Sequence, residues 1–214
     1  MSAHTVSFAG IVIAVGPGAL VPRLETELLA TAALAKLVGV AAPRVVDVCC
    51  GTGNLACAIA SARSDARVWA CDLTAGAVVL ARANVASLSL GGRVSVAQGD
   101  LFAPLAGDLL DGTIDAIVCN PPYISTGKLA GRPDLANEPR EAFDGGPYGL
   151  TIHQRVIREG VGLLRPGGVL LFEFGVGQGR QLELLFKRAG GYRAVTMAHD
   201  SAGVPRVAMA HRRG

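Results

Sequence analysis

Short apolar runs alternate with helical patterns along most of this chain. The apolar runs are about five or six residues long, which is typical of a buried strand. They predict strands at residues 44–49, 67–71, 93–97, 114–119 and 169–174. Apolar residues at helical spacing predict helices over residues 55–63, 75–87, 152–164 and 178–189. This alternation is typical of an α/β fold whose strands are mostly parallel.

The two ends of the chain predict additional elements. Residues 7–15 have the pattern of a short β-hairpin, and residues 25–38 that of a helix. Residues 192–198 and 206–211 predict two final strands, paired as an antiparallel hairpin. The expected architecture is therefore an α/β fold with a seven-stranded, mostly parallel sheet, a C-terminal antiparallel hairpin and helices on both faces.

Composition narrows the class of protein. Half of the 214 residues are apolar and 17% are charged, so the chain can bury a sizeable core and is not disordered. The net charge is +3 and no basic run forms a phosphate-binding patch, so direct nucleic-acid binding is not expected. The N-terminus lacks a signal-peptide pattern, and no apolar stretch reaches the roughly 20 residues of a membrane span. These features predict a cytoplasmic protein.

The five cysteines do not form a recognisable metal or disulfide pattern. Their number is odd, no C-x-x-C pair occurs, and no secretion signal accompanies them. We therefore predict inert, buried thiols and no metal site. Glu173 is unusual because it lies in an apolar strand. A buried carboxylate needs partners, so we expect Glu173 to be paired or close to a functional site.

A glycine-containing turn follows the first predicted strand of the sheet and opens a helix. Residues 47–54 read DVCCGTGN, and such glycines let the backbone approach a ligand, although a plain strand-to-helix turn is also possible. Asp72 ends the second strand, where a carboxylate can accept hydrogen bonds from ribose hydroxyls. Asp100 ends the third strand, where it could accept one from an adenine amino group. Ligands of open sheets bind at these strand ends, so the positions predict one nucleotide-like site.

The pattern is not that of a dinucleotide site. The fingerprint Gly-x-Gly-x-x-Gly is met at Gly51 and Gly53, but the third position is Ala56, which only looser versions tolerate. Asp47 would repel a pyrophosphate, because like charges repel. It suits a cationic ligand better, such as an ammonium or sulfonium compound.

The fourth strand ends in the motif Asn120-Pro121-Pro122-Tyr123. The side-chain oxygen of Asn120 and the carbonyl of Pro121 can both accept hydrogen bonds from one NH2 group. Such acceptors orient a delocalised, weakly nucleophilic nitrogen and stabilise the positive charge that develops on it. Tyr123 can stack on a flat substrate group. We interpret the motif as the site of methyl transfer to a planar nitrogen rather than as a proline-rich turn.

Together these segments resemble class I methyltransferases and, more narrowly, the HemK/PrmC family of protein-(glutamine-N5) methyltransferases. Further stretches that carry the narrower likeness are residues 21–27 (VPRLETE), 138–146 (EPREAFDGG), 149–150 (GL), 164–168 (LRPGG), 173–179 (EFGVGQG) and 199–207 (HDSAGVPRV). The resemblance covers about residues 8–211. It implies a Rossmann-like catalytic domain in residues 41–214, on which residues 1–40 pack as a hairpin-and-helix extension.

The resemblance also implies the cofactor and the roles of individual residues. The cofactor would be S-adenosyl-L-methionine, with S-adenosyl-L-homocysteine as the product. Cys49 to Gly53 would line its methionine end, Asp72 would hold the ribose, and Leu101 would pack near the adenine. The full predicted cofactor set is Asp47, Cys49, Cys50, Gly51, Thr52, Gly53, Asp72, Asp100, Leu101 and Asn120. The predicted catalytic set is Asn120, Pro121, Pro122 and Tyr123, which would grip the glutamine amide during direct in-line displacement.

The chain departs from the family pattern at three places. Cys49 stands where the family usually has glycine, and Leu24 replaces a proline in the segment Pro-Arg-Pro-Glu-Thr-Glu. Bacterial members usually carry an N-terminal helical domain that helps to dock the release factor, and here only about twenty residues precede Pro22. A helper subunit, or contact through the catalytic domain alone, could replace that domain.

Three functional hypotheses follow. The first is N5-methylation of the glutamine in the Gly-Gly-Gln motif of a peptide-chain release factor, which is then the expected partner. The second is the same chemistry on another protein, a small molecule or a nucleic-acid base. The third is a non-enzymatic module that binds the cofactor or a partner without turnover. The intact Asn-Pro-Pro-Tyr motif argues against this third hypothesis.

Overall fold

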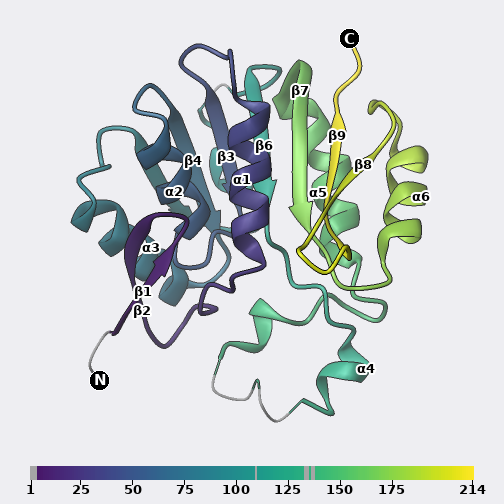
Figure 1. Ribbon diagram of the computed structural model, residues 1–214, viewed down its shortest axis with the longest axis horizontal. Coiled ribbons are helices and arrows are strands. Elements are labelled where there is room, and N and C mark those ends of the chain that lie inside the picture. Colours follow the sequence, from purple (N-terminus) through teal and green to yellow (C-terminus); the bar gives the residue numbers. More distant parts are fainter. Residues whose placement is uncertain (1–3, 109, 133–134, 136–137) are drawn as a thin grey trace.

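The computed structural model describes residues 4–108, 110–132, 135 and 138–214. Its main feature is a seven-stranded sheet in the order β5-β4-β3-β6-β7-β9-β8 (Figure 1). The five parallel strands are β3 (Arg44–Val48), β4 (Arg67–Asp72), β5 (Val94–Gln98), β6 (Ile114–Cys119) and β7 (Leu164–Glu173). The antiparallel strands are β8 (Thr196–His199) and β9 (Pro205–His211). The predicted α/β fold with a C-terminal antiparallel hairpin is confirmed.

Both faces of the sheet are apolar, because its central strands are buried on both sides. Alternate residues face opposite ways, so Val45 joins one hydrophobic cluster and Val46 the other. The first cluster includes residues of α1 (Thr26–Lys36), α2 (Asn54–Ala62) and α3 (Ala75–Ser87). The second includes residues of α5 (Thr151–Leu163) and α6 (Gly179–Ala189). Helices therefore cover both faces, and Figure 1 shows α1 and α5 on opposite sides.

The N-terminal segment shares the first of these two clusters. Strands β1 (His4–Phe8) and β2 (Ile11–Val15) form a separate hairpin, as predicted. Phe8 and Ile13 of this hairpin pack in the same cluster as residues of α1, α2 and α3. A Cβ on Gly18 would lie 3.0 Å from the Cα of Gly76, so the chain after the hairpin closely approaches the start of α3. The division into an extension of residues 1–40 and a domain of residues 41–214 stays a prediction.

Two strands begin several residues away from their predicted starts, while β5 and β9 begin one residue away. β7 begins at Leu164, five residues before the predicted start, because Leu164 pairs with Ile114 across a register shift. A Cβ on Gly168 would lie 2.7 Å from the carbonyl oxygen of Ile114, so this close approach requires glycine. β8 begins at Thr196 instead of residue 192, and Tyr192 makes only an isolated bridge to Arg212. The first residues of β7 and β8 depend on pairing with neighbouring strands. The pattern of apolar residues along the chain does not contain that information.

Among the residues that the structure describes between β5 and α5 are three short helices that were not predicted. They are η1 (Ala103–Leu105), α4 (Thr126–Leu129) and η3 (Arg140–Ala142). The last two belong to the long segment below the carboxyl edge of the sheet, where Figure 1 shows α4. In the part of the chain that the structure describes, no helix combines the length and apolar character needed to cross a membrane.

Candidate active site

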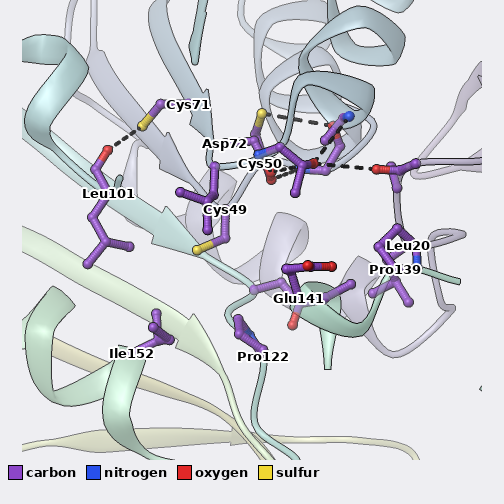
Figure 2. A pocket seen from close by; sticks show the side chains of 18 of the residues that line it. Leu20, Cys49, Cys50, Cys71, Asp72, Leu101, Pro122, Pro139, Glu141 and Ile152 are labelled. Atoms are coloured by element: carbon purple, nitrogen blue, oxygen red, sulfur yellow. Dashed lines mark hydrogen bonds between the residues drawn. The ribbon is translucent and has the colours of Figure 1, made fainter. Parts of the chain in front are cut away.

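The predicted ligand-binding positions meet at the carboxyl edge of the parallel strands. A cavity of about 410 Å³ lies there, a volume within the range of small-molecule pockets, roughly 300–1,000 Å³. Figure 2 shows the side chains that reach it from several elements. The predicted residues that line it are Cys49, Cys50, Gly51, Asp72, Asp100, Leu101, Asn120 and Pro122. Most of the predicted set is therefore brought together.

The turn after β3 has the backbone conformation that its glycines predict. Gly51 and Gly53 have φ of +54° and +75°, in the left-handed region that favours glycine. A Cβ on Gly53 would lie 3.1 Å from that of Ala81, so this glycine lets the turn lie against α3. Cys49 also has a positive φ, +59°, although it carries a side chain. The turn thus holds one strained residue next to the cavity.

Asp72, at the end of β4, is the carboxylate best placed for a ligand. Its Oδ2 accepts a hydrogen bond from the backbone N–H of Gly51 at 2.9 Å. Its Oδ1 accepts from the backbone N–H and the hydroxyl of Thr74, at 3.0 and 3.1 Å. These bonds fix the carboxylate at the cavity wall (Figure 2). Its Oδ2, which takes one of them, has a lone pair left for a ligand hydroxyl.

Three residues of the predicted cofactor set do not line the cavity. Asp47 and Thr52 are buried behind the turn, and Gly53 faces α3. Oδ2 of Asp47 accepts a hydrogen bond from the backbone N–H of Ala56 at 2.9 Å. Burial raises the pKa of Asp47 to about 8, so the carboxyl is mostly neutral at pH 7. In this structure Asp47 supports the turn from behind, instead of presenting a charge to a cationic ligand.

Asp100 and Leu101 occupy the end of the cavity near α5. The carboxylate of Asp100 is paired with Arg155, with N–O distances of 2.9 and 3.0 Å. This partner lies 55 residues away in the sequence, and no local pattern indicated it. The side chain of Leu101 is buried and lines the cavity, while its carbonyl oxygen lies 3.0 Å from the thiol of Cys71 (Figure 2). Leu101 therefore supplies an apolar wall.

A second cavity, of about 510 Å³, lies beside the first. Asn120 lines both cavities, Pro122 lines the first, and Pro121 and Tyr123 line the second. The motif that sequence analysis predicted as the reaction site thus spans the boundary between two compartments. One compartment can hold a nucleotide-like ligand and the other a second molecule, with Asn120 in contact with both.

A buried polar network lies behind Asn120. Its side-chain Nδ2 donates to Oγ1 of Thr26 at 3.1 Å, and Thr26 donates to Oε2 of Glu173 at 2.7 Å. The hydroxyl of Tyr123 donates to Oε1 of Glu173 at 3.0 Å, and Arg206 lies 3.5 Å from the same oxygen. Glu173 is only 1% exposed, and the expectation that it is paired is confirmed. Burial raises the pKa of Glu173, while the hydrogen bonds from Thr26 and Tyr123 lower it.

Tyr123 keeps its proton in this network. Burial, followed by the nearby charge of Glu173, raises the pKa of its hydroxyl to about 12. The guanidinium of Arg206 lies 6.0 Å from the centre of the Tyr123 ring. Tyr123 therefore lines the second cavity with an uncharged ring whose hydroxyl is fixed by Glu173.

Two of the segments that carry the narrower family likeness, residues 21–27 and 138–146, are joined in space. Arg23 and Glu138 form an ion pair at 2.5 Å, and the backbone N–H of Val21 donates to Glu138 at 2.8 Å. Both charged residues line the second cavity. From the next few residues, Pro139 and Glu141 reach the wall of the first cavity (Figure 2). No pattern in the sequence indicates that these segments are in contact, because more than 110 residues separate them.

Comparisons with known proteins agree with this geometry. Residues 25–138 match the family model described as "Methyltransferase small domain". The chain is 40% identical to the release factor glutamine methyltransferase of Moorella thermoacetica, over 96% of this chain and 72% of that protein.

Solved structures give the same picture. The crystal structure of a release factor-specific protein-(glutamine-N5) methyltransferase from Alicyclobacillus acidocaldarius is 28% identical, with a TM-score of 0.54, over 94% of this chain and 99% of that one. A 16S rRNA methyltransferase from T. thermophilus, solved with AdoMet and guanosine, shares the fold at 19% identity and a TM-score of 0.68, over 99% of this chain and 50% of that one. The chain therefore belongs to the family of release factor glutamine methyltransferases.

Proposed function

We propose that this protein transfers a methyl group from S-adenosylmethionine to the side-chain amide nitrogen of a glutamine in a peptide-chain release factor. Relatives that are 40%, 34% and 37% identical to the chain are named release factor glutamine methyltransferases. The observation that carries the proposal is the position of Asn120, which lines both cavities. A methyl donor in one cavity and an amide in the other would meet at this residue. A translation factor as substrate would place the activity in the cytoplasm.

The residues of the first cavity fit S-adenosylmethionine. Asp72 offers a fixed carboxylate to ribose hydroxyls, Leu101 an apolar wall to an adenine, and Gly51 an open backbone position to the methionine end. Cys49 and Cys50 complete the wall beside Gly51. When bound, this cofactor supplies an electrophilic methyl group on a sulfonium.

The residues of the second cavity fit a primary amide. Oδ1 of Asn120 and the carbonyl of Pro121 would accept the two N–H groups of the glutamine and turn its nitrogen toward the first cavity. As positive charge develops on the nitrogen, both oxygens stabilise it, and the proton can leave afterwards. The ring of Tyr123 provides a flat surface against the amide plane. We assign Asn120, Pro121 and Tyr123 to this site, and Pro122, which lines the first cavity, to the boundary between the two cavities.

The direct test is incubation of the purified protein with methyl-labelled S-adenosylmethionine and a purified release factor. We expect label on the glutamine of the Gly-Gly-Gln motif, located by mass spectrometry, and none on a release factor in which that glutamine is alanine. Asn120→Ala should reduce turnover by about 100- to 1,000-fold, by analogy with the loss of one oxyanion-hole donor in other enzymes. Val38→Ala, at an exposed position beyond the far end of α1, is the matched surface control and should turn over normally.

Two results would overturn the proposal. In the first, the folded protein shows no binding of S-adenosylmethionine by calorimetry. In the second, label appears only on an acceptor other than the release factor, which would support the same chemistry on a different nitrogen. Because the assay contains only purified components, activity there would also show that no helper subunit is required.

A further inference from the structure

Thr26 and Glu173 are buried polar side chains to which the proposed reaction gives no direct role, although Thr26 also lines the first cavity. Both are about 1% exposed, and they are joined by a hydrogen bond of 2.7 Å. They come from α1 and β7, 147 residues apart in the sequence, and meet directly behind Asn120. Two polar groups at such a depth are costly unless each is fully paired. Their arrangement therefore requires an explanation.

The hydrogen bonds along this chain of groups have one consistent direction. An ionised carboxylate only accepts hydrogen bonds, and a threonine hydroxyl has a single proton to donate. The proton of Thr26 is used by Glu173, so Oγ1 of Thr26 presents a lone pair to Asn120. Asn120 must therefore donate to this lone pair through its NH2 group, and Nδ2 of Asn120 makes the 3.1 Å bond to Thr26. The Oδ1 atom of Asn120 then points away from Thr26.

The second oxygen of the same carboxylate fixes the other polar group of the motif. Oε1 of Glu173 accepts from the hydroxyl of Tyr123 at 3.0 Å and lies 3.5 Å from Arg206. Arg206 also donates to the hydroxyl of Tyr123 at 3.3 Å, so that hydroxyl must direct its own proton to Glu173. One buried carboxylate thus sets the hydrogen-bond direction on both Asn120 and Tyr123.

We propose that Thr26 and Glu173 are positioning residues that hold the Asn120 amide with its oxygen, rather than its nitrogen, toward the second cavity. The inference rests on the proposed function, in which that oxygen accepts a hydrogen bond from the substrate NH2 group. If the Asn120 amide were turned by 180°, its NH2 group would face the NH2 group of the substrate, and neither could accept a hydrogen bond. The buried pair removes this alternative before substrate arrives, which is the benefit of preorganisation.

The first test compares two substitutions at one position. Thr26→Val keeps the shape of the side chain but loses the hydroxyl, whereas Thr26→Ser keeps the hydroxyl. We expect Thr26→Val to lower kcat by about 10- to 100-fold, by analogy with the loss of an outer hydrogen-bond partner of a metal ligand, with the Kd for S-adenosylmethionine changed less than about twofold. Thr26→Ser should recover most of the turnover. Equal turnover by the two variants, or a loss confined to cofactor affinity, would overturn the proposal.

The second test needs neither substrate nor activity. The chain has four asparagines, Asn54, Asn84, Asn120 and Asn137, so NMR spectra of protein labelled with ¹⁵N at asparagine side chains are simple. The Asn120 signals are identified by their absence in Asn120→Ala. We expect one Asn120 amide proton to exchange slowly with water in the wild type and in Thr26→Ser, and at least about tenfold faster in Thr26→Val and Glu173→Gln. Unchanged exchange in both latter variants would overturn the proposal.

The two tests separate this inference from the proposed function. If the wild type does not methylate a release factor but Asn120 exchange responds as expected, the substrate is wrong and the positioning stands. If the wild type is active and neither kcat nor exchange responds to loss of the Thr26 hydroxyl, the positioning is wrong and the function stands. Melting temperatures of the variants, with Val38→Ala as the surface control, exclude loss of the fold as the cause.

Discussion

At the scale of single residues, Cys49 combines two properties that oppose each other. It lies on the cavity wall, and its backbone has φ +59°, which costs a residue with a Cβ roughly 1–2 kcal/mol. The family usually has glycine at this position, which would adopt the conformation without strain. The turn therefore stores free energy at a place where it borders the proposed cofactor site.

This strain predicts an order of stability for two variants. Cys49→Ala and Cys49→Gly both remove the thiol and differ only in the Cβ. The glycine variant should have the larger free energy of unfolding, by about 0.5–1 kcal/mol after the greater flexibility of glycine in the unfolded chain is allowed for. Urea unfolding without ligand measures the difference. Gly51→Ala, which adds a Cβ at φ +54° in open space, is the opposite control and should destabilise. An alanine variant as stable as the glycine variant would contradict the interpretation.

At the scale of elements, Asn84 ties three segments together. It is fully buried in α3, and its Oδ1 accepts from the backbone N–H of Ala14 at 2.7 Å. Its Nδ2 donates to the carbonyls of Ala14 and Thr52, both at 2.9 Å. One side chain therefore pairs the backbone of β2 with α3 and with the turn that borders the first cavity. The N-terminal hairpin is connected to the proposed cofactor site through this residue.

We expect Asn84→Asp to break this connection. A carboxylate has no N–H to give, so two buried carbonyls would face a negative charge. The free energy of unfolding should fall by about 3 kcal/mol or more, because each unsatisfied buried group costs roughly 1–3 kcal/mol. Chemical denaturation measures the loss, and calorimetry should show weaker binding of S-adenosylmethionine. Ala83→Ser, on the exposed side of the same helix, should change stability by only about 0.5 kcal/mol. Similar losses in the two variants would show that Asn84 does not connect these elements.

At the scale of the whole molecule, two buried groups make stability depend on pH in opposite directions. Burial lowers the pKa of His153 from its ordinary 6.5 to about 4, and its Nε2 lies 2.9 Å from the carbonyl of Glu173. Neutral His153 thus stabilises the fold above pH 6.5, and this contribution is lost as the pH falls toward 4. Burial raises the pKa of Asp47 from 3.8 to about 8, so its contribution is present below pH 4 and is lost as the pH rises through 8.

These two effects offset each other between about pH 4 and 6.5, and only the Asp47 effect remains above that range. From pH 6.5 to 8 the free energy of unfolding should fall by roughly 2 kcal/mol through Asp47, at about 1.4 kcal/mol per pH unit. Asp47→Asn should remove most of this fall. His153→Gln should gain about 3 kcal/mol relative to the wild type as the pH falls from 6.5 to 4. Urea unfolding across this pH range measures both, and parallel curves for all three proteins would contradict the assignment.

The sequence by itself determined the main strands and helices and the chemistry of the strand ends. Alternating apolar runs predicted the seven strands, because burial of strands and helix faces leaves a periodic trace along the chain. Asp72 and the Asn-Pro-Pro-Tyr motif were predicted because each directly follows a strand, and parallel strand ends share one edge. The glycines of the turn were informative because their backbone conformation is a local property.

Only the tertiary structure decided which groups those residues meet. Asp47 carries the same carboxyl group as Asp72, yet one is buried behind the turn and the other faces the cavity. The partners of Glu173 come from α1, the Asn-Pro-Pro-Tyr motif and β9, far apart in the sequence. Burial, charge pairing and the direction of a hydrogen bond depend on neighbours brought together by folding. No pattern within one segment contains that information.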